Sequence, residues 1–376
     1  MIYLDNAATT KPSKEALKSF NQVSETLFFN TASIHKGGRD AARLLEAARG
    51  QILNELGLGT HHLIFTSGAT ESNNIILRGM IERKLQFGKT VLVSELEHPS
   101  VVNVLEHYKD KINLQFIKTT PQGVIDLDDL KEKLNDECIL VSVMALNNII
   151  GSIQPIEEIG QILQSYKKVY FHVDATQAVG KVTLDYKNVD ALTLSAHKFY
   201  GIKGAGALIV NDMNVIDPLL LGGGHEKDKR SGTVNLPAIV AMAKALRISN
   251  ENLTQKNDRL EQFNNKVRTH FNDYNKMKIQ DAQSPYFINL SFVGAKGEIV
   301  VNALSELGIY VSTTSACASK SNELNETLLA IGNKNDVIEG SIRISFSQNT
   351  TEEEVDALIK GLDTVYKQLG DILHEV

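Results

Sequence analysis

The sequence predicts an α/β fold, with a largely parallel sheet covered by helices on both faces and a second, smaller domain. Short apolar runs typical of buried strands alternate with helical patterns through the first two-thirds of the chain. At 376 residues the chain is too long for one small core. The apolar fraction of 42% and the charged fraction of 22% are those of an ordinary globular protein.

The elements of the large domain follow from the spacing of apolar residues. Strands are expected at 61–66, 90–95, 113–119, 138–146, 169–174, 191–195 and 205–210. Helices are expected between them, at 70–84, 98–110, 127–134 and 155–168, the last with Pro155 in its first turn. In such a sheet, ligands bind beyond the carboxyl ends of the strands. The informative side chains should therefore follow the strands directly.

A long helical pattern at 236–271 marks the passage to the second domain, and it is long enough to form two helices. The runs at 286–293, 299–309 and 341–347 then give an α+β pattern. We expect a large domain over 15–255 and a small domain built from 1–14 and 256–376.

The charge balance and the absence of long apolar runs limit the classes of protein. The net charge is −6, which argues against a constitutive nucleic-acid surface while leaving room for a local basic patch. The first residues show no signal-peptide pattern, and no stretch of about 18 apolar residues occurs. A soluble, cytoplasmic protein without a membrane span is the expectation.

The two cysteines lie in different settings. Cys138 begins an apolar run and reads as an inert buried thiol. Cys317 lies among small and polar residues, where a lone cysteine is a candidate reactive thiol or simply a spare surface thiol.

Small and hydroxyl residues follow the strand at 61–66 and begin the next helix, with Ala69 and Thr70 at its start. Free backbone N–H groups and the helix dipole make such a start a site for an anion such as phosphate. An ordinary helix cap would need the same residues.

A carboxylate and a lysine follow two later strands. Asp174 either caps the next helix or holds a protonated ring nitrogen. Lys198, preceded by His197, is either a lysine that reaches solvent or a reactive amine. With the anion site on the same sheet edge, the set favours pyridoxal phosphate bound to Lys198 as a Schiff base.

His98 also follows a strand, and its imidazole could stack on a flat ring, move a proton or simply begin a helix. The segments 222–225 and 230–233 are rich in glycine and anion donors, or form a plain surface loop.

Seven short strings in this order, FTSGATESNN, HVDATQAVGK, SAHKFYG, GGGHE, RSGT, SAC and SIRIS, resemble the cysteine desulfurases of the class-V aminotransferase family. The resemblance runs from YLDNAATT (3–10) to TTEEEVDALI (350–359). It implies a type I aminotransferase-like fold with a mostly parallel seven-stranded sheet, pyridoxal 5'-phosphate as cofactor and no metal.

The resemblance also implies roles for individual residues. Lys198 would carry the cofactor, Asp174 would pair with its ring nitrogen, and Gln177 would bind its phenolic oxygen. His98 would stack on the ring and move protons, while Asn148 and Arg343 would hold the substrate carboxylate. The residues implied to surround the cofactor are Ala69, Thr70, His98, Asn148, Asp174, Gln177, Ser195, His197, Lys198 and, from the neighbouring subunit of a homodimer, Thr233.

Cys317 matches the nucleophile that takes sulfur from L-cysteine as a persulfide and leaves L-alanine. Cys317 and Arg343 lie 26 positions apart (343 − 317), which resembles the group that passes sulfur to protein acceptors. The acceptor would be a scaffold or thiolation enzyme serving iron–sulfur clusters, tRNA thiolation or thio-cofactors, and no direct nucleic-acid contact is expected. The sequence names neither the acceptor nor the conformation of the Cys317 loop.

Three positions depart from the family pattern, with Ile149 replacing an acid, Ile202 replacing a proline and Thr31 standing in a usual Gly-Asn-Pro string. Their effect on rate is open. The alternatives are a selenocysteine lyase, a cysteine sulfinate desulfinase or a non-catalytic persulfide carrier. Persulfide on Cys317 would separate the first two from a desulfurase, and an absorbance band dependent on Lys198 would exclude the carrier.

Overall fold

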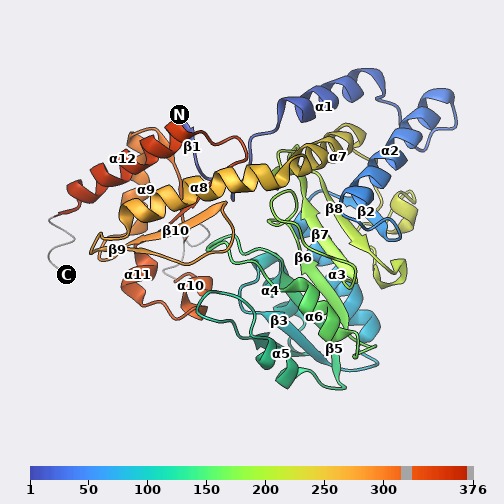
Figure 1. The fold of residues 1–376 in the computed structure, drawn as a ribbon. Helices are drawn as coiled ribbons and strands as arrows, with labels where there is room; N and C mark the ends of the chain where they lie inside the picture. The colour runs from blue at the N-terminus through green and yellow to red at the C-terminus, as the bar shows by residue number, and fades with distance from the viewer. Residues whose placement is uncertain (315–323, 371–376) are drawn as a thin grey trace.

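A seven-stranded sheet forms the centre of the larger part of the molecule in the computed structural model, which describes residues 1–314 and 324–370 (Figure 1). The strand order is β2-β8-β7-β6-β5-β3-β4, and β8 runs opposite to the other six strands. The strands are β2 (His62–Thr66), β3 (Thr90–Ser94), β4 (Asn113–Ile117), β5 (Cys138–Met144), β6 (Tyr170–Asp174), β7 (Ala191–Ser195) and β8 (Gly206–Val210). The prediction of a mostly parallel seven-stranded sheet is confirmed.

Helices cover both faces of this sheet, because successive residues of each strand point to opposite sides. Val91 and Val93 of β3 pack in one apolar cluster with α3 (Ala69–Lys84) and α4 (Pro99–His107). Leu92, between them, packs in the other cluster. That second cluster includes residues of α1 (Lys14–Thr26), α2 (Lys36–Glu55), α5 (Leu127–Lys133), α6 (Ile156–Leu163) and α7 (Leu236–Asn250). Pro155 is the N-cap of α6, so the helix starts one residue later than predicted and ends earlier.

A four-stranded antiparallel sheet forms the smaller part, in the order β12-β13-β10-β9. Its strands are β9 (Met277–Ile279), β10 (Phe287–Phe292), β12 (Ser312–Thr313) and β13 (Ser341–Ser345). Its helices are α8 (Leu253–Phe271), α9 (Gly297–Glu306), α10 (Glu326–Ala330), α11 (Asn335–Glu339) and α12 (Glu352–Gln368). The stretch 236–271 is two helices, separated at Asn252 by a left-handed backbone conformation with φ 52°. The predicted domain boundary at 255 stays a prediction.

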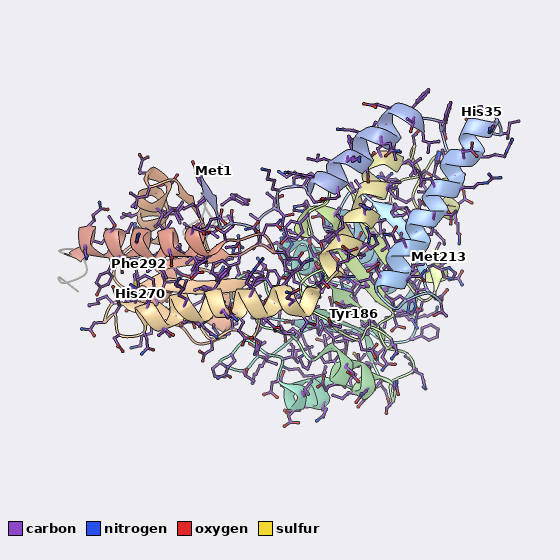
Figure 2. The ribbon with its side chains drawn as sticks, turned by 45° about the horizontal axis from the view of Figure 1, so that its top comes forward. Met1, His35, Tyr186, Met213, His270 and Phe292 are labelled. Atoms are coloured by element: carbon purple, nitrogen blue, oxygen red, sulfur yellow. The ribbon has the colours of Figure 1, made fainter. Side chains whose placement is uncertain are left out.

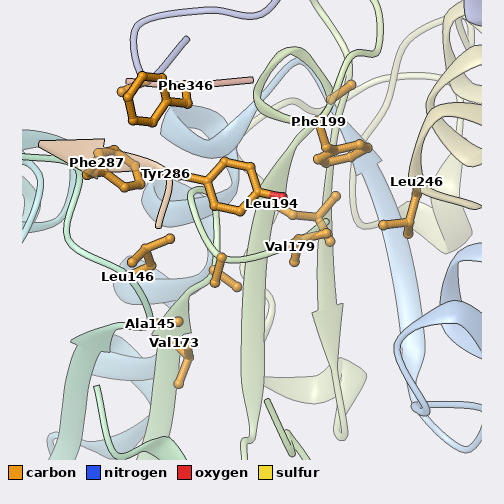
Figure 3. Packing of buried hydrophobic residues seen from close by; sticks show 14 of the residues in the cluster. Ala145, Leu146, Val173, Val179, Leu194, Phe199, Leu246, Tyr286, Phe287 and Phe346 are labelled. Carbon is orange, nitrogen blue, oxygen red and sulfur yellow. The ribbon is translucent and has the colours of Figure 1, made fainter. Parts of the chain in front are cut away.

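The two parts are joined along α8 and through a shared core. Figure 2 shows α8 running from the neighbourhood of Tyr186 to the end where His270 and Phe292 lie. Tyr286, fully buried just before β10, lies in one apolar cluster with Val179 and Leu194 of the larger part (Figure 3). Its hydroxyl donates to the Oδ1 of Asn257 at 3.0 Å. None of the helices in the described residues combines the length and the apolar character needed to cross a membrane.

The N-terminal segment touches both parts. β1 (Ile2–Tyr3) pairs in parallel with β11 (Ile309–Tyr310), and Asp5 forms a bridge with Ser345 of β13. A few residues later, Thr10 donates from its backbone N to the carbonyl of His197 at 2.9 Å. Residues 2–10 therefore connect the smaller part to the loop that follows β7.

Candidate active site

A cavity of about 690 Å³ lies at the carboxyl ends of β2, β6 and β7. Residues 7–9 of the N-terminal segment and Arg343 of β13 complete its walls. Ten of the predicted site residues line it: Ala69, Thr70, His98, Asn148, Asp174, Gln177, Ser195, His197, Lys198 and Arg343. The structure thus brings these ten residues together around one cavity, and their individual roles stay predictions.

The start of α3 forms a pocket of free backbone donors. Its N-cap is Gly68, with no side-chain cap, so the N–H groups of Ala69 and Thr70 have no partner within the helix. Gly68 has φ 156°, which residues with a side chain rarely adopt. A Cβ at position 206 would lie 2.5 Å from the Cα of Gly68, so a glycine is also needed there in β8. The backbone donors and the Ser195 hydroxyl, beside Gly68, suit an anion.

Lys198 lies at the end of a short 3₁₀ turn (Ala196–Lys198) that follows β7. Its Nζ donates to the carbonyls of Ala7 at 2.6 Å and Ala8 at 2.9 Å. Burial, helped by the charge of Arg343, lowers the pKa of this amine to about 8, although two nearby carboxylates oppose the change. Lys198 is thus held in the cavity by neutral carbonyls, with an amine that loses its proton readily.

Asp174 ends β6 and is 5% exposed. Its Oδ2 accepts from the Nδ2 of Asn73 at 2.9 Å, and its Oδ1 accepts from the backbone N of Thr176 at 3.0 Å. Among the residues that the structure describes, no basic side chain forms a salt bridge with it. A buried carboxylate without a cation suits a ligand that supplies a positively charged N–H. Asn73 is a functional partner that the sequence analysis missed.

Gln177 and Lys181 form hydrogen bonds with the backbone around Lys198. The Nε2 of Gln177 donates to the carbonyl of Ala7 at 2.9 Å, the same carbonyl that accepts from Lys198. Lys181 donates to the backbone carbonyls of Gln177 and Lys198, each at 3.0 Å. Burial, together with the charge of Lys198, lowers the pKa of Lys181 to about 7. Lys181 was also missed, although its spacing of four from Gln177 in HVDATQAVGK was a signal.

Two histidines line the cavity in their neutral forms. His98 is the N-cap of α4, and its Nδ1 accepts from the backbone N of Ser100 at 3.1 Å. It is one of the residues that line the cavity, and burial, which outweighs the attraction of Asp174, lowers its pKa. Burial and neighbouring lysines lower the pKa of His197 to about 4, and its Nδ1 lies 3.1 Å from the hydroxyl of Thr9.

Arg343 reaches the cavity from β13 and is 6% exposed. Its Nη2 donates to the Oδ1 of Asp5 at 2.8 Å, and its Nη1 donates to the backbone carbonyl of Asn148 at 3.1 Å. Its Nε is buried and has no partner among the described residues. The guanidinium is held in one orientation with a donor to spare, which suits a carboxylate ligand. Asp5 is a third partner that the sequence analysis did not identify.

Within the described residues, Thr233 is the predicted site residue that does not line the cavity. It is exposed in the loop before α7. Cys317 lies outside the described residues.

The three positions that depart from the family pattern are packed in different ways. Ile149 is 9% exposed and packs with Leu328 and Ile338, so an apolar contact replaces the acid. Ile202 packs against the main core, and Thr31 lies half-buried between α1 and α2.

The cavity fits pyridoxal phosphate by the chemistry of its donor set. Uncapped backbone N–H groups and Ser195 match a phosphate, Asp174 matches a protonated ring nitrogen, and Lys198 offers an amine to an aldehyde. The three groups line one cavity rather than separate surfaces.

Comparisons with known proteins agree with this geometry. Residues 2–358 match the family model described as aminotransferase class-V. The chain therefore belongs to the class-V aminotransferase family, with its mostly parallel α/β fold. Within it the chain is one of the cysteine desulfurases, as the following relatives and structures indicate.

A NifS/IcsS protein homolog of Lactobacillus delbrueckii is 39% identical, over 100% of this chain and 99% of its own length. A cysteine desulfurase IscS of Dictyoglomus turgidum is 36% identical, over 99% of this chain and 96% of its own length. The solved structure of a NifS-like protein superposes with a TM-score of 0.91 at 32% identity, covering 98% of this chain and 100% of that one. Another solved structure, that of SspA in complex with cysteine, superposes with a TM-score of 0.80 at 28% identity. The match covers 93% of this chain and 100% of that one.

Proposed function

We propose that this chain converts L-cysteine to L-alanine with pyridoxal phosphate as cofactor and takes the sulfur onto Cys317 as a persulfide. The observation that carries the proposal is the single cavity that holds the low-pKa amine of Lys198, the buried carboxylate of Asp174 and the free donors at the start of α3. The solved relative in complex with cysteine supports the choice of substrate.

Asp174 would hold the ring nitrogen of the cofactor, Gln177 its phenolic oxygen, and Ala69, Thr70, Ser195 and His197 its phosphate. When bound, pyridoxal phosphate supplies a ring that accepts the electron pair left on the substrate after its α-proton is removed. Asn73 keeps Asp174 oriented through its hydrogen bond at 2.9 Å.

Different residues of the cavity would bind the substrate and move its protons. Arg343 and Asn148 bind the substrate carboxylate, which places the α-carbon near Lys198. Lys198, with a pKa of about 8, is unprotonated often enough at neutral pH to remove the α-proton. Neutral His98, facing the same cavity, is in reach to pass protons to and from the reacting atoms.

The sulfur step balances without an added oxidant. The thiolate of Cys317 forms an S–S bond with the sulfur of L-cysteine, the C–S bond of the substrate breaks, and a proton goes to the carbon left behind. One thiol and one cysteine become one persulfide and one L-alanine. A protein acceptor then takes the outer sulfur, and we place the reaction in a cytoplasmic homodimer in which Thr233 of each subunit reaches the other's phosphate.

Alanine and persulfide formation by the purified protein, measured over time with labelled L-cysteine, tests the proposal. We expect one alanine per persulfide, with the label on the peptide that carries Cys317. Cys317→Ala should abolish both products, while Cys138→Ala, at a buried thiol whose pKa is raised to about 12 by burial, should leave both intact. Full activity in Cys317→Ala would contradict the desulfurase mechanism.

A further inference from the structure

The first turn of α3 carries an acidic side chain at the edge of the proposed phosphate site. Glu71 accepts from the backbone N of Ser67 at 2.6 Å and from the Nε of Arg230 at 2.8 Å. A second contact, from the Nη2 of Arg230 to the other Glu71 oxygen, is 3.4 Å long. The side chains of Arg230 and Glu71 are only 22% and 13% exposed. The pair thus lies mostly out of solvent, where charges act strongly on one another.

Glu71 poses an electrostatic problem for the binding of a phosphate. Burial on its own would raise the pKa of Glu71, but hydrogen bonds from Arg230 and Ser67 outweigh it and lower the pKa. The carboxylate is therefore charged at neutral pH, and its residue lines the same cavity as the uncapped start of α3. The Glu71 carboxylate and a bound phosphate would both lie at the N-terminus of α3, where their negative charges repel each other.

We propose that Arg230 is a charge-compensating positioning residue, which neutralises Glu71 so that the phosphate of the cofactor can bind at the start of α3. The inference rests on the proposed function, because it takes a phosphate-bearing cofactor as the ligand. Lys198 and Lys203 also line the cavity, but neither forms a salt bridge with Glu71 in the described part of the chain.

The loop that carries Arg230 is held in place independently. Glu226 forms two contacts of 2.9 Å with the guanidinium of Arg49 and accepts from the backbone N of Phe65 in β2. Glu226, Lys227 and Asp228 are consecutive left-handed residues, with φ 51°, 56° and 63°. Non-glycine residues adopt this conformation only where surrounding contacts impose it. Arg49 is committed to Glu226, and Arg230 is left to neutralise Glu71.

The test compares two aldehydes that differ only in the phosphate, pyridoxal phosphate and pyridoxal, binding to cofactor-free protein followed by absorbance. In Arg230→Gln we expect the dissociation constant for pyridoxal phosphate to rise about tenfold, and that for pyridoxal to change less than about twofold. Arg247→Gln is the matched control, because Arg247 forms an arginine–glutamate pair on the exposed surface of α7 with Glu251. It should bind both aldehydes as the unmodified protein does.

The double variant Glu71→Gln/Arg230→Gln separates charge from structure. If repulsion is the cause, removing the carboxylate as well should restore pyridoxal phosphate binding to within about threefold. Glu71→Gln alone should bind it at least as tightly as the unmodified protein. Equal weakening of both aldehydes in Arg230→Gln, or no recovery in the double variant, would mean that Arg230 only holds the loop, and the inference would be wrong.

Thermal unfolding of each cofactor-free variant identifies a loss of structure. Should Arg230→Gln unfold, Arg230→Lys keeps the charge with a different shape, and we expect it to retain the preference for the phosphorylated aldehyde. A loss of that preference in folded Arg230→Lys would overturn the inference. Failure of the unmodified protein to bind either aldehyde would instead overturn the proposed function.

Discussion

The two sheets contribute to the cavity in different ways. The seven-stranded sheet delivers Lys198, Asp174 and the start of α3 from the ends of separate strands. The four-stranded antiparallel sheet delivers Arg343 from the middle of β13, with Ser312 of β12 beside it in register. Parallel strands gather many loops at one edge, whereas an antiparallel strand presents a side chain on its face. The larger sheet therefore suits cofactor chemistry, and the smaller one suits holding the substrate.

The largest effect should come from the larger sheet. Lys198→Ala removes the amine that we propose binds the aldehyde and takes the α-proton, so we expect kcat to fall by at least about 1,000-fold. The absorbance band of the Schiff base between the cofactor and the protein should disappear. Lys187→Ala, at an exposed lysine paired with Asp185, is the control and should behave as the unmodified protein. A Schiff-base band retained in Lys198→Ala would place the reactive amine elsewhere.

The smaller sheet should affect substrate affinity more than turnover. In Arg343→Lys a single ammonium replaces the fork that Asp5 and Asn148 hold in place. We expect KM for L-cysteine to rise about 10- to 100-fold and kcat to change by less than about fivefold, measured from initial rates of alanine formation. A fall in kcat with KM unchanged would give Arg343 a role in the chemistry. The assignment of substrate binding alone to the smaller sheet would then be wrong.

The pH dependence of aldehyde binding reports on both sheets at once. Only the neutral amine of Lys198 reacts, so the rate at which cofactor-free protein combines with pyridoxal should rise about tenfold per pH unit below about pH 8 and level off above it. Burial is the main cause of the lowered pKa, and the charge of Arg343 adds to it. In Arg343→Gln we therefore expect the plateau to begin at higher pH. Stopped-flow absorbance would show whether the profile moves.

The same amine links stability to pH. Its folded pKa of about 8 lies below the ordinary 10.5, so the unfolded chain binds more protons between those values. The contribution of Lys198 to stability is therefore lowest below about pH 8 and improves as the pH rises toward 10.5.

The smallest effect should come from Cys138, the first residue of β5 in the larger sheet. Cys138→Ala removes one buried sulfur atom, so we expect a loss of about 1 kcal/mol in the free energy of unfolding. Urea unfolding followed by circular dichroism would measure it. Steady-state kinetics should be unchanged, and a change in kcat would give this thiol a role that its position does not suggest.

Local patterns were enough to predict the seven strands of the larger sheet and several residues that line the cavity. Each buried strand is a short apolar run, and the polar residues that follow it meet at one edge because parallel strands share a direction. Lys198, Asp174 and Ala69 were found in this way. Arg343 and Asn148 came from the resemblance, since nothing in their own surroundings indicates a ligand.

The partners of these residues could not be predicted, because they depend on contacts between distant parts of the chain. Asp5 and Arg343 are 338 positions apart, and Arg230 and Glu71 are 159 apart. Asn73 lies 101 positions from Asp174 and reads in the sequence as an ordinary polar residue of a helix. The ends of strands can be predicted from one sequence. The pairs of polar side chains that contact each other across the fold cannot, because no local pattern marks them.

The short strand at the N-terminus has a consequence for how the protein is made on the ribosome. Residues 2–10 need Ile309, Tyr310 and Ser345 as partners before they can settle, and Ala7 and Ala8 supply the carbonyls that hold Lys198. Residues 2–10 must therefore wait for β11 and β13, which are synthesised much later, and a polypeptide stalled before β13 would expose an incomplete site. Loading of the cofactor is expected to follow the synthesis of β13 rather than precede it.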